Sequence, residues 1–263
     1  MAERAAIVTG GSSGIGLAIA RMLAEEGYAL TVAARRPEKL TEAADGLRAD
    51  GYDVQEVAGN LSDEDVIKSV VETHKERFGR LDVLVNNAGV GVAAAAGDHE
   101  TKRIHLQLSV NLRAIVLFYR ESLELLRAAG AEHRSALVVN TSSISGKSGQ
   151  PWLSVYSATK AGVVGYTQAI NKELNGGRHQ ERRAVPRLRG DPDDGVRAGA
   201  RSRDRLPASR GGVVTLGTNS RKEPSSTPFR GSVHLHILGR RPCREPHHWR
   251  GHRRQPPGAP GAD

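Results

Sequence analysis

Short apolar runs alternate with helical stretches along the first two thirds of the chain, and this alternation most constrains its fold. The apolar runs have strand length and β-branched content, and they lie at residues 5–9, 29–34, 53–59, 81–86 and 136–142. Helical patterns lie between and after them, at residues 14–27, 37–51, 62–79, 109–130 and 156–174. Apolar strands joined by helical crossovers predict an α/β, Rossmann-type doubly wound fold, in which helices cover both faces of a parallel sheet. Ligands of such sheets bind at the carboxyl ends of the strands.

Local signals agree with this alternation. Ser62, with Asp65 three residues later, predicts a capping box at the start of the third helix. Gly27, Gly51 and Gly79 predict the ends of the first three helices, because glycine readily adopts the left-handed conformation that closes a helix.

The composition changes sharply after residue 176. Residues 1–176 hold 19 Lys and Arg against 21 Asp and Glu, whereas residues 177–263 hold 19 against 8. The second part also carries ten of the twelve prolines, and 18 of its 19 basic residues are arginine. The formal net charge of +9 therefore comes from residues 177–263. The sequence predicts a folded core over residues 1–176 and an Arg/Pro/Gly-rich, aberrant or disordered tail over residues 177–263.

Compartment signals are few. The single cysteine, Cys243, excludes an internal disulfide and is typical of a reducing compartment. A predicted strand begins a few residues from Met1, so no secretory signal is expected. No apolar run approaches the ~20 residues needed to span a bilayer. We expect a soluble, cytoplasmic protein without membrane association.

A glycine-rich turn joins the first strand to the first helix. The stretch "IVTGGSSGIG" sets Thr9, Gly10, Gly14 and Gly16 at this turn. Glycines here permit a tight turn and a close approach of the backbone to a pyrophosphate, and the helix N-terminus supplies N–H groups and a positive dipole. The position of the motif between a strand and a helix favours dinucleotide binding over an ordinary turn.

Five motifs in order resemble the classical short-chain dehydrogenases/reductases. They are the G-x-x-x-G-x-G turn, "NNAG" at Asn86–Gly89, "SVNLRA" with Asn111, "NTSSISG" with Ser143, and "YSATK" with Tyr156 and Lys160. The resemblance covers residues 5 to about 176, which it identifies as a dinucleotide-binding and catalytic core. It implies the catalytic residues Asn111, Ser143, Tyr156 and Lys160. It also implies these cofactor-binding residues: Thr9, Gly10, Ser12, Ser13, Gly14, Ile15, Gly16, Arg35, Arg36, Asn60, Leu61, Asn87, Ala88, Gly89, Tyr156 and Lys160.

The end of the second strand indicates which cofactor is preferred. An acidic residue there would accept hydrogen bonds from the adenosine ribose of NAD, but the sequence has Ala34 followed by Arg35 and Arg36. Guanidinium groups suit a 2′-phosphate, so we expect NADP(H) rather than NAD(H). The alternative is a solvated arginine pair ahead of a helix. Asn60 stands where the family commonly has an aspartate beside the adenine, and its amide can still accept a hydrogen bond.

The resemblance gives each catalytic residue a role. Tyr156 and Lys160 share one helix face, and an ammonium one turn away favours the phenolate, so the phenol can exchange a proton with a substrate oxygen. Lys160 would also hold the nicotinamide ribose. Ser143 lies thirteen residues before Tyr156 and would donate a hydrogen bond to the substrate carbonyl, whereas strand alternation would turn Ser142 away. Asn111 would anchor a water that links Lys160 to solvent.

The tail departs from the family, whose later strands and helices are missing or scrambled in residues 177–263. Back-translation from Arg178 with G/C-rich codons, read one base later, gives an apolar strand and then Pro-Gly, as the family would have there. We therefore hypothesise a frameshift close to Gly176–Arg178. A genuine disordered arm and a nucleic-acid-binding arm are alternatives, the second disfavoured because the basic residues form no patch. The spacing of Cys243, His247, His248 and His252 fits no standard zinc site, and no metal is expected.

The function predicted is hydride transfer between NADP(H) and a small-molecule carbonyl/alcohol substrate. Two alternatives stay open: a cofactor-binding chain with little or no turnover, because its C-terminal part is lost, and a basic-tailed interaction protein. Relatives of this kind imply a homodimer or homotetramer if the C-terminal part folds. Nucleic acid is an unlikely partner.

Overall fold

The computed structural model describes residues 3–133, 135–176, 210–218 and 234–236. Its strands are β1 (Ala5–Thr9), β2 (Ala29–Ala34), β3 (Val54–Ala58), β4 (Val83–Asn86), β5 (Ser135–Ser143), β6 (Arg210–Thr218) and β7 (His234–His236). Its helices are α1 (Gly14–Glu25), α2 (Pro37–Ala49), α3 (Glu64–Phe78), α4 (Thr101–Leu108), α5 (Ala114–His133) and α6 (Ser154–Gly176). A π-helical turn, η1 (Ser109–Arg113), joins α4 to α5, and a short 3-10 turn, η2 (Ile144–Gly146), follows β5.

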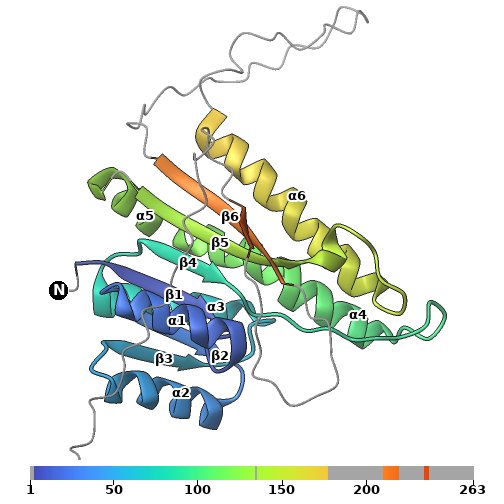
Figure 1. Ribbon diagram of the computed structural model, residues 1–263, viewed down its shortest axis with the longest axis horizontal. Helices are drawn as coiled ribbons and strands as arrows, with labels where there is room; N and C mark the ends of the chain where they lie inside the picture. The colour runs from blue at the N-terminus through green and yellow to red at the C-terminus, as the bar shows by residue number, and fades with distance from the viewer. Residues whose placement is uncertain (1–2, 134, 177–209, 219–233, 237–263) are drawn as a thin grey trace, which may run out of the picture.

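The strands form one sheet in the order β3-β2-β1-β4-β5-β6-β7 (Figure 1). All neighbouring pairs from β3 to β6 are parallel, and β7 is antiparallel to β6. The predicted doubly wound fold is thus confirmed. The strand order reverses between β1 and β4, and in such sheets the crevice beyond the carboxyl ends at this reversal is where ligands bind.

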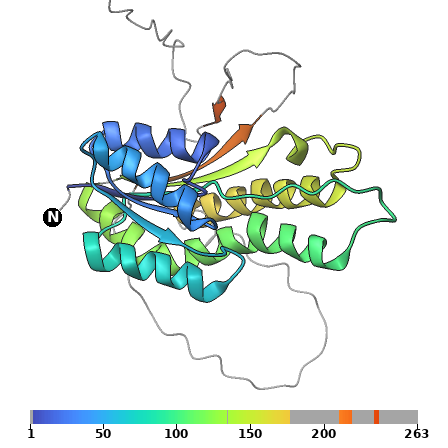
Figure 2. The same ribbon diagram turned by 90° about the horizontal axis from the view of Figure 1, so that it is seen from below.

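Two helical layers bury the two faces of the sheet (Figure 2). On one face, Ala20 and Ala24 of α1 and Leu40 and Leu47 of α2 pack against the strands. On the other, α3 and α5 bury a second cluster: Ile67, Val70, Val71, Ala114, Leu117, Phe118 and Leu126. The β1 residues Ala5–Val8 are fully buried because the strand lies between both layers. This accounts for the continuous apolar strands in the sequence.

The predicted helix ends are confirmed, but one predicted helix start is wrong. Gly27, Gly51 and Gly79 have φ angles of 84°, 90° and 70°, the left-handed conformation expected after a helix. The capping residue of α3 is Asp63 rather than Ser62, because the Asp63 carboxylate accepts a hydrogen bond from the Asp65 amide at 3.0 Å. Three consecutive polar residues made the sequence pattern ambiguous by one position.

The long helix that carries Asn111 begins earlier than the sequence pattern indicates. The prediction starts it at residue 109, whereas α4 begins at Thr101 and η1 continues it into α5. The stretch "TKRIHLQL" is largely polar, and only Gln107 is fully buried in it. π-Helical turns in helices occur frequently at functional sites, and this one contains Asn111.

Beyond α6, the sequence predicts that the later strands and helices of the family are missing or scrambled, and the described part of this region consists of two strands, β6 and β7. Nine residues of β6 pair in parallel with the whole of β5, and β7 pairs with β6. The "GGVVTLGT" stretch contains a β-branched run too short to stand out in an Arg- and Pro-rich sequence. The hypothesised frameshift position, close to Gly176–Arg178, begins at the last residue of α6 and otherwise lies outside the described residues. Most of the tail also lies outside them, including Cys243, His247, His248 and His252.

Within the described ranges, no helix is both long enough and apolar enough to cross a membrane. The same ranges contain no group of three or more His, Cys, Asp or Glu side chains arranged to hold a metal ion.

Candidate active site

The carboxyl edge of the sheet brings together the residues that the motifs predicted. The glycine-rich turn follows β1, "NNAG" ends β4 and Ser143 ends β5, and these three strands are adjacent in the sheet. Tyr156 and Lys160 approach the same edge from α6, whose first turns pack on η2 and β5. Residues separated by about 150 positions in the sequence therefore converge at one place.

Thr9 fastens the β1 turn to the β4 turn. Its buried hydroxyl donates to the Val85 carbonyl at 3.2 Å and accepts from the amides of Asn87 and Ala88 at 3.0 and 3.1 Å. The Asn87 side chain donates in return to the Thr9 carbonyl at 3.2 Å. Because both partners are backbone groups of neighbouring strands, these bonds fix the two turns relative to each other.

The glycines of the turn after β1 are required for two different reasons, lack of space for a side chain and a positive φ angle. A Cβ at Gly16 would lie 2.2 Å from the Gly10 carbonyl oxygen and 2.5 Å from Asn87 Nδ2, so no side chain fits between helix and turn. Gly10 and Gly14 have φ angles of 69° and 55°, which disfavour residues with a Cβ. The space beside Gly14 is open, with no atom within 4 Å of its Cβ position.

The N-terminus of α1 has no side-chain cap. Ser13 occupies the capping position in extended conformation, but its side chain makes no capping hydrogen bond. The first N–H groups of α1 therefore lack a side-chain acceptor, and they adjoin the open side of Gly14. Such a terminus suits an anionic ligand such as a phosphate.

The remaining predicted cofactor residues lie along the same edge. Arg35 and Arg36 follow β2, both exposed, and Arg36 caps α2 through its backbone. Asn60 follows β3 and accepts a hydrogen bond from the Ser62 amide at 3.2 Å, which holds the turn into α3. Leu61 is 5% exposed and belongs to the core below this turn.

Lys160 is a buried ammonium held at the end of β5. Its side chain is 3% exposed, and Nζ donates to the Thr141 carbonyl at 2.8 Å. Burial lowers the pKa of Lys160 to about 8, because the charged form loses hydration. Nζ lies 5.8 Å from the centroid of the Tyr156 ring, within the range of a cation–π contact.

Tyr156 stands against the backbone of the segment after β4. A Cβ at Gly91 would lie 3.6 Å from the Tyr156 ring, so this glycine lets the backbone pass close to the phenol. A Cβ at Gly89 would likewise lie 3.4 Å from Lys160 Nζ. Small residues after β4 thus leave room for both side chains.

The two serines at the end of β5 have different surroundings. The Ser142 hydroxyl donates to the Lys160 carbonyl at 2.9 Å and so fastens β5 to α6. The Ser143 hydroxyl accepts from the Ser145 amide at 3.2 Å, which leaves its own proton available to another acceptor. Both serines are buried, at 2% and 8% exposure.

Asn111 positions the segment after β4. Its amide donates to the Val90 carbonyl and accepts from the Val90 amide, both at 2.8 Å, and it also donates to Thr159 Oγ1 at 3.0 Å. One helical turn earlier, Gln107 accepts from the Val92 amide at 3.1 Å. Two buried amides at i and i+4 thus hold residues 90–92, and Asn111 also joins them to the Tyr156 helix.

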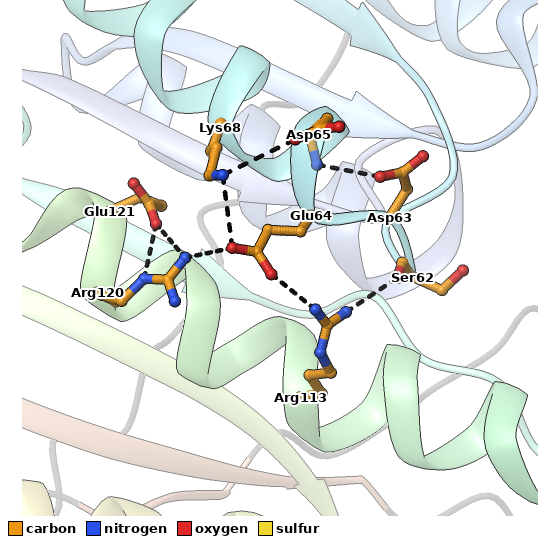
Figure 3. Close-up of polar contacts among 8 residues, drawn as sticks. All are labelled: Ser62, Asp63, Glu64, Asp65, Lys68, Arg113, Arg120 and Glu121. Carbon is orange, nitrogen blue, oxygen red and sulfur yellow. Dashed lines mark hydrogen bonds and ion pairs between the residues drawn. The ribbon is translucent and has the colours of Figure 1, made fainter.

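An ion-pair cluster holds the π-helical turn to the start of α3 (Figure 3). The Glu64 carboxylate receives Arg113 and Arg120, each at 2.7 Å, and Lys68 at 3.5 Å. Arg113 also donates to the Ser62 carbonyl at 3.2 Å. The hydrogen bond from Arg120, together with the positive charge around it, lowers the pKa of Glu64. Arg113 closes the turn that contains Asn111, so the cluster restrains that turn from outside.

A cavity of about 210 Å³ opens among these residues. It is lined by Ile15, Asn87, Gly89, Val90, Gly91, Thr141, Ser142, Tyr156 and Lys160. Ser142 therefore lines the cavity, contrary to the expectation from strand alternation, whereas Ser143 and Asn111 are not among the lining residues. The cavity lining carries one charged side chain, that of Lys160. Two of the other lining residues, Gly89 and Gly91, have no side chain and leave the backbone accessible. The arrangement can hold a ligand against a phenol and a buried ammonium.

Sequence reasoning missed three residues that the structure brings into the site. The Thr141 carbonyl accepts the hydrogen bond from Lys160 Nζ. The Thr159 hydroxyl accepts from the Asn111 amide and donates to the Tyr156 carbonyl. Gln107 accepts from the Val92 amide and so positions residues 90–92 together with Asn111. The spacing of Gln107 and Asn111 on one helix face was a usable signal. The role of Thr141 left no signal in the sequence, because it depends on the backbone carbonyl, which every residue has.

Comparisons with known proteins agree with the geometry. Residues 4–178 match the short chain dehydrogenase family. The chain belongs to this family. A Streptomyces violaceoruber protein named as ketoacyl reductase 1 of the granaticin polyketide synthase is 36% identical over 174 residues, which cover 66% of this chain and 63% of that protein.

Solved structures are also similar. A short-chain dehydrogenase/reductase of Burkholderia phymatum in complex with NAD has a TM-score of 0.62 and 28% identity, covering 65% of this chain and 59% of that one. A metagenomic short-chain oxidoreductase in complex with NADP has a TM-score of 0.62 and 33% identity, covering 66% and 76%. The chain thus spans less than two thirds of the length of the Streptomyces ketoacyl reductase and of the Burkholderia dehydrogenase/reductase.

Proposed function

We propose that this short-chain dehydrogenase is an NADP(H)-dependent oxidoreductase that interconverts a carbonyl compound and its alcohol. The observation that carries the proposal is the pairing of Tyr156 with the buried Lys160 ammonium, 5.8 Å from ring centroid to Nζ, beside a cavity at the switch point of the sheet. Similar proteins are described as a ketoacyl reductase and as oxidoreductases in complex with NAD or NADP.

The residues present fit a nicotinamide dinucleotide. The uncapped N-terminus of α1 and the open side of Gly14 suit its pyrophosphate. The lining of the cavity from Asn87 to Gly91 offers backbone groups to its other half. When bound, the cofactor supplies or accepts the hydride.

In the reducing direction, Tyr156 would donate its hydroxyl proton to the substrate oxygen. Lys160 would stabilise the negative charge that develops on the phenol, because a buried ammonium acts at low local dielectric. Ser143, whose proton is not used by its bond to the Ser145 amide, would donate to the same oxygen. Asn111 would keep residues 90–92 against Tyr156, and a water-mediated relay past Asn111 would resupply the proton.

The preference for NADP(H) rests on Arg35 and Arg36 at the end of β2. Both are exposed and follow Ala34, which has no carboxylate to accept from a ribose hydroxyl. Two guanidinium groups there can bind a 2′-phosphate bidentately. The double variant R35A/R36A should weaken NADPH binding roughly 10-fold or more while changing NADH binding little. Equal losses for both cofactors would contradict the preference.

The activity is tested with the full 263-residue chain. We expect oxidation of NADPH, followed by its absorbance, on addition of carbonyl compounds, and a roughly 100- to 10,000-fold lower kcat for Y156F. The matched control is Y166F, on the same helix but outside the cavity lining. Saturable NADPH binding without turnover of any carbonyl compound would instead favour a cofactor-binding protein.

The domain division is part of the proposal: residues 1–176 form the dinucleotide-binding and catalytic core. Resequencing the coding DNA across Lys172–Arg189 tests the frameshift hypothesis directly. A single inserted or deleted base assigns the tail no function of its own. An intact frame means that the Arg-rich segment is made as written, which favours the interaction-protein alternative.

A further inference from the structure

Trp152 combines two features that a folded protein usually avoids. Among the described residues it is the one non-glycine residue with a positive φ, at 59°. Its side chain is also 68% exposed, which makes it the most exposed of the large apolar side chains in the described part. A bulky residue in the left-handed region is strained. An indole that stays exposed to solvent contributes little hydrophobic stabilisation to the fold. Such strain in a folded chain concentrates at ligand sites.

Neighbouring backbone holds Trp152 in this conformation. The Ala94 amide donates to the Trp152 carbonyl at 2.9 Å, and the Leu153 amide donates to the Gln150 carbonyl at 3.1 Å. The Gln150 amide in turn donates to Ser157 Oγ in the first turns of α6 at 3.3 Å. The strained conformation is therefore fixed on both sides by the structure around it.

The segment after β4 runs along both Trp152 and Tyr156. Gly91 lies against the Tyr156 ring, and Ala94 bonds the Trp152 backbone. Further on, His99 Nε2 lies 2.9 Å from the Ser154 hydroxyl. The same short segment thus passes the Tyr156 ring at Gly91 and bonds the Trp152 backbone three residues later, at Ala94. Gly91 lines the cavity, so Trp152 lies next to this segment just beyond the cavity-lining residues.

The chemistry of this margin is apolar. Ile144, directly after Ser143, is 49% exposed, and residues 92–96 are valine and alanine. Lys160 is the one charged residue in the cavity lining, and it is bonded to Thr141. The side chains of Trp152, Ile144 and residues 92–96, which flank the cavity-lining residues in the sequence, are therefore an indole, a branched aliphatic group and small apolar groups.

We propose that Trp152 is a substrate-recognition residue whose indole packs against an uncharged aryl or cyclic group of a ketone or secondary alcohol. The inference rests on the proposed function, since it takes the oxygen of the substrate to be at Tyr156. A flat indole face favours a planar or cyclic partner over a short aliphatic chain.

The test compares acetophenone with propanone at saturating NADPH, using W152G in the full chain. Glycine tolerates a positive φ, so W152G removes the indole without adding strain, and its Tm should equal or exceed that of the wild type. We expect kcat/KM for acetophenone to fall roughly tenfold or more relative to that for propanone, mainly through KM. The matched control is M22A, which truncates a 64% exposed apolar side chain on α1 and should change neither ratio nor Tm appreciably.

A second readout needs no turnover. The chain has two tryptophans, so in W249F the fluorescence comes from Trp152 alone. Phenylethanol added with NADP should change this emission saturably, whereas propan-2-ol should not. Turnover with no emission change and an unaltered ketone preference in W152G would overturn the inference while leaving the proposed function intact. Saturable emission changes without turnover of any ketone would overturn the proposed function instead. Absence of both would overturn both.

Discussion

Lys160 Nζ donates a 2.8 Å hydrogen bond to the backbone carbonyl of Thr141, so a neutral group is the partner of this buried ammonium. Among the described residues no carboxylate pairs with Lys160, and its pKa falls to about 8 through loss of hydration. A carbonyl satisfies one of three N–H donors and leaves the ammonium able to act on other groups. A carboxylate partner would have neutralised the charge that the proposed chemistry needs.

Replacing Lys160 by methionine should separate stability from activity. We expect K160M to lower kcat roughly 100-fold or more, since it removes the charge beside Tyr156. The pKa of Lys160 is about 8 in the folded chain and ordinarily 10.5, so the unfolded chain binds the proton more readily between these values. Stability therefore rises with pH across this window, and below pH 8 the buried charge costs about 3 kcal/mol.

Accordingly, K160M should unfold at an equal or higher temperature than the wild type at pH 7, and this difference should shrink between pH 8 and 10. Thermal unfolding at several pH values measures it. K172M, which changes an exposed lysine on the same helix, is the matched control and should show neither effect. A large destabilisation of K160M at pH 7 would contradict the account of its burial.

Two glycine-to-alanine variants should have opposite effects on stability. G16A forces a Cβ to within 2.2 Å of the Gly10 carbonyl oxygen, so we expect lower stability by about 2 kcal/mol or more and lost NADPH binding. G46A lies at an exposed helical position in α2 with no atom near its Cβ, and should gain about 0.5–1 kcal/mol. Urea unfolding and cofactor titration of both variants check this, and a stable G16A that binds NADPH would contradict the proposed turn geometry.

His74 should make the fold sensitive to mild acid. It is fully buried, its Nδ1 lies 2.8 Å from the Thr31 hydroxyl, and its Nε2 lies 2.8 Å from the Arg80 carbonyl. Because a carbonyl only accepts, Nε2 carries the proton and neutral Nδ1 accepts from Thr31. Burial lowers the pKa of His74 from 6.5 to about 4.

The unfolded chain therefore binds this proton first, and the contribution of His74 is complete above pH 6.5 and lost as pH falls toward 4, by about 3 kcal/mol. H74L should be less stable than the wild type at pH 7 but lose less stability on acidification to pH 4, as measured by urea unfolding. H105L, which changes an exposed histidine on α4, should follow the wild type. Equal acid sensitivity of H74L and the wild type would contradict this assignment.

The Glu64 cluster should stabilise the chain in a salt-dependent way. E64Q removes the charge that receives Arg113, Arg120 and Lys68, so its Tm at low salt should fall below that of the wild type. The difference should narrow near ~1 M NaCl, where charges at the surface are screened. D65N, in the same turn and with a 93% exposed carboxylate, is the control and should have a smaller effect. A Tm difference that is independent of salt would indicate packing rather than charge.

The sequence was sufficient for strands β1 to β5 and most of the helices between them, for the glycine-rich turn after β1 and for the Tyr156–Lys160 pair. Each depends on local spacing: apolar runs of strand length, glycines that end helices, and an i,i+4 pair on one face. Local spacing also has limits, as the start of α3 shows. Ser62 and Asp63 are adjacent polar residues with equal capping ability in the sequence, and only the fold decided that Asp63 accepts the Asp65 amide.

Composition and periodicity are sufficient to say which side chains are present and which local elements carry them. Which backbone groups meet those side chains depends on how the folded elements pack together. The Thr141 carbonyl under Lys160, the hold of Gln107 and Asn111 on residues 90–92, and the strained Trp152 beside Ala94 all join distant segments through main-chain atoms. Main-chain atoms are the same in every residue, so the sequence does not say which carbonyl or amide a side chain will meet, even where the spacing of the side chains, as for Gln107 and Asn111, is visible. The pairing follows from the packing of the strands and helices that carry these groups.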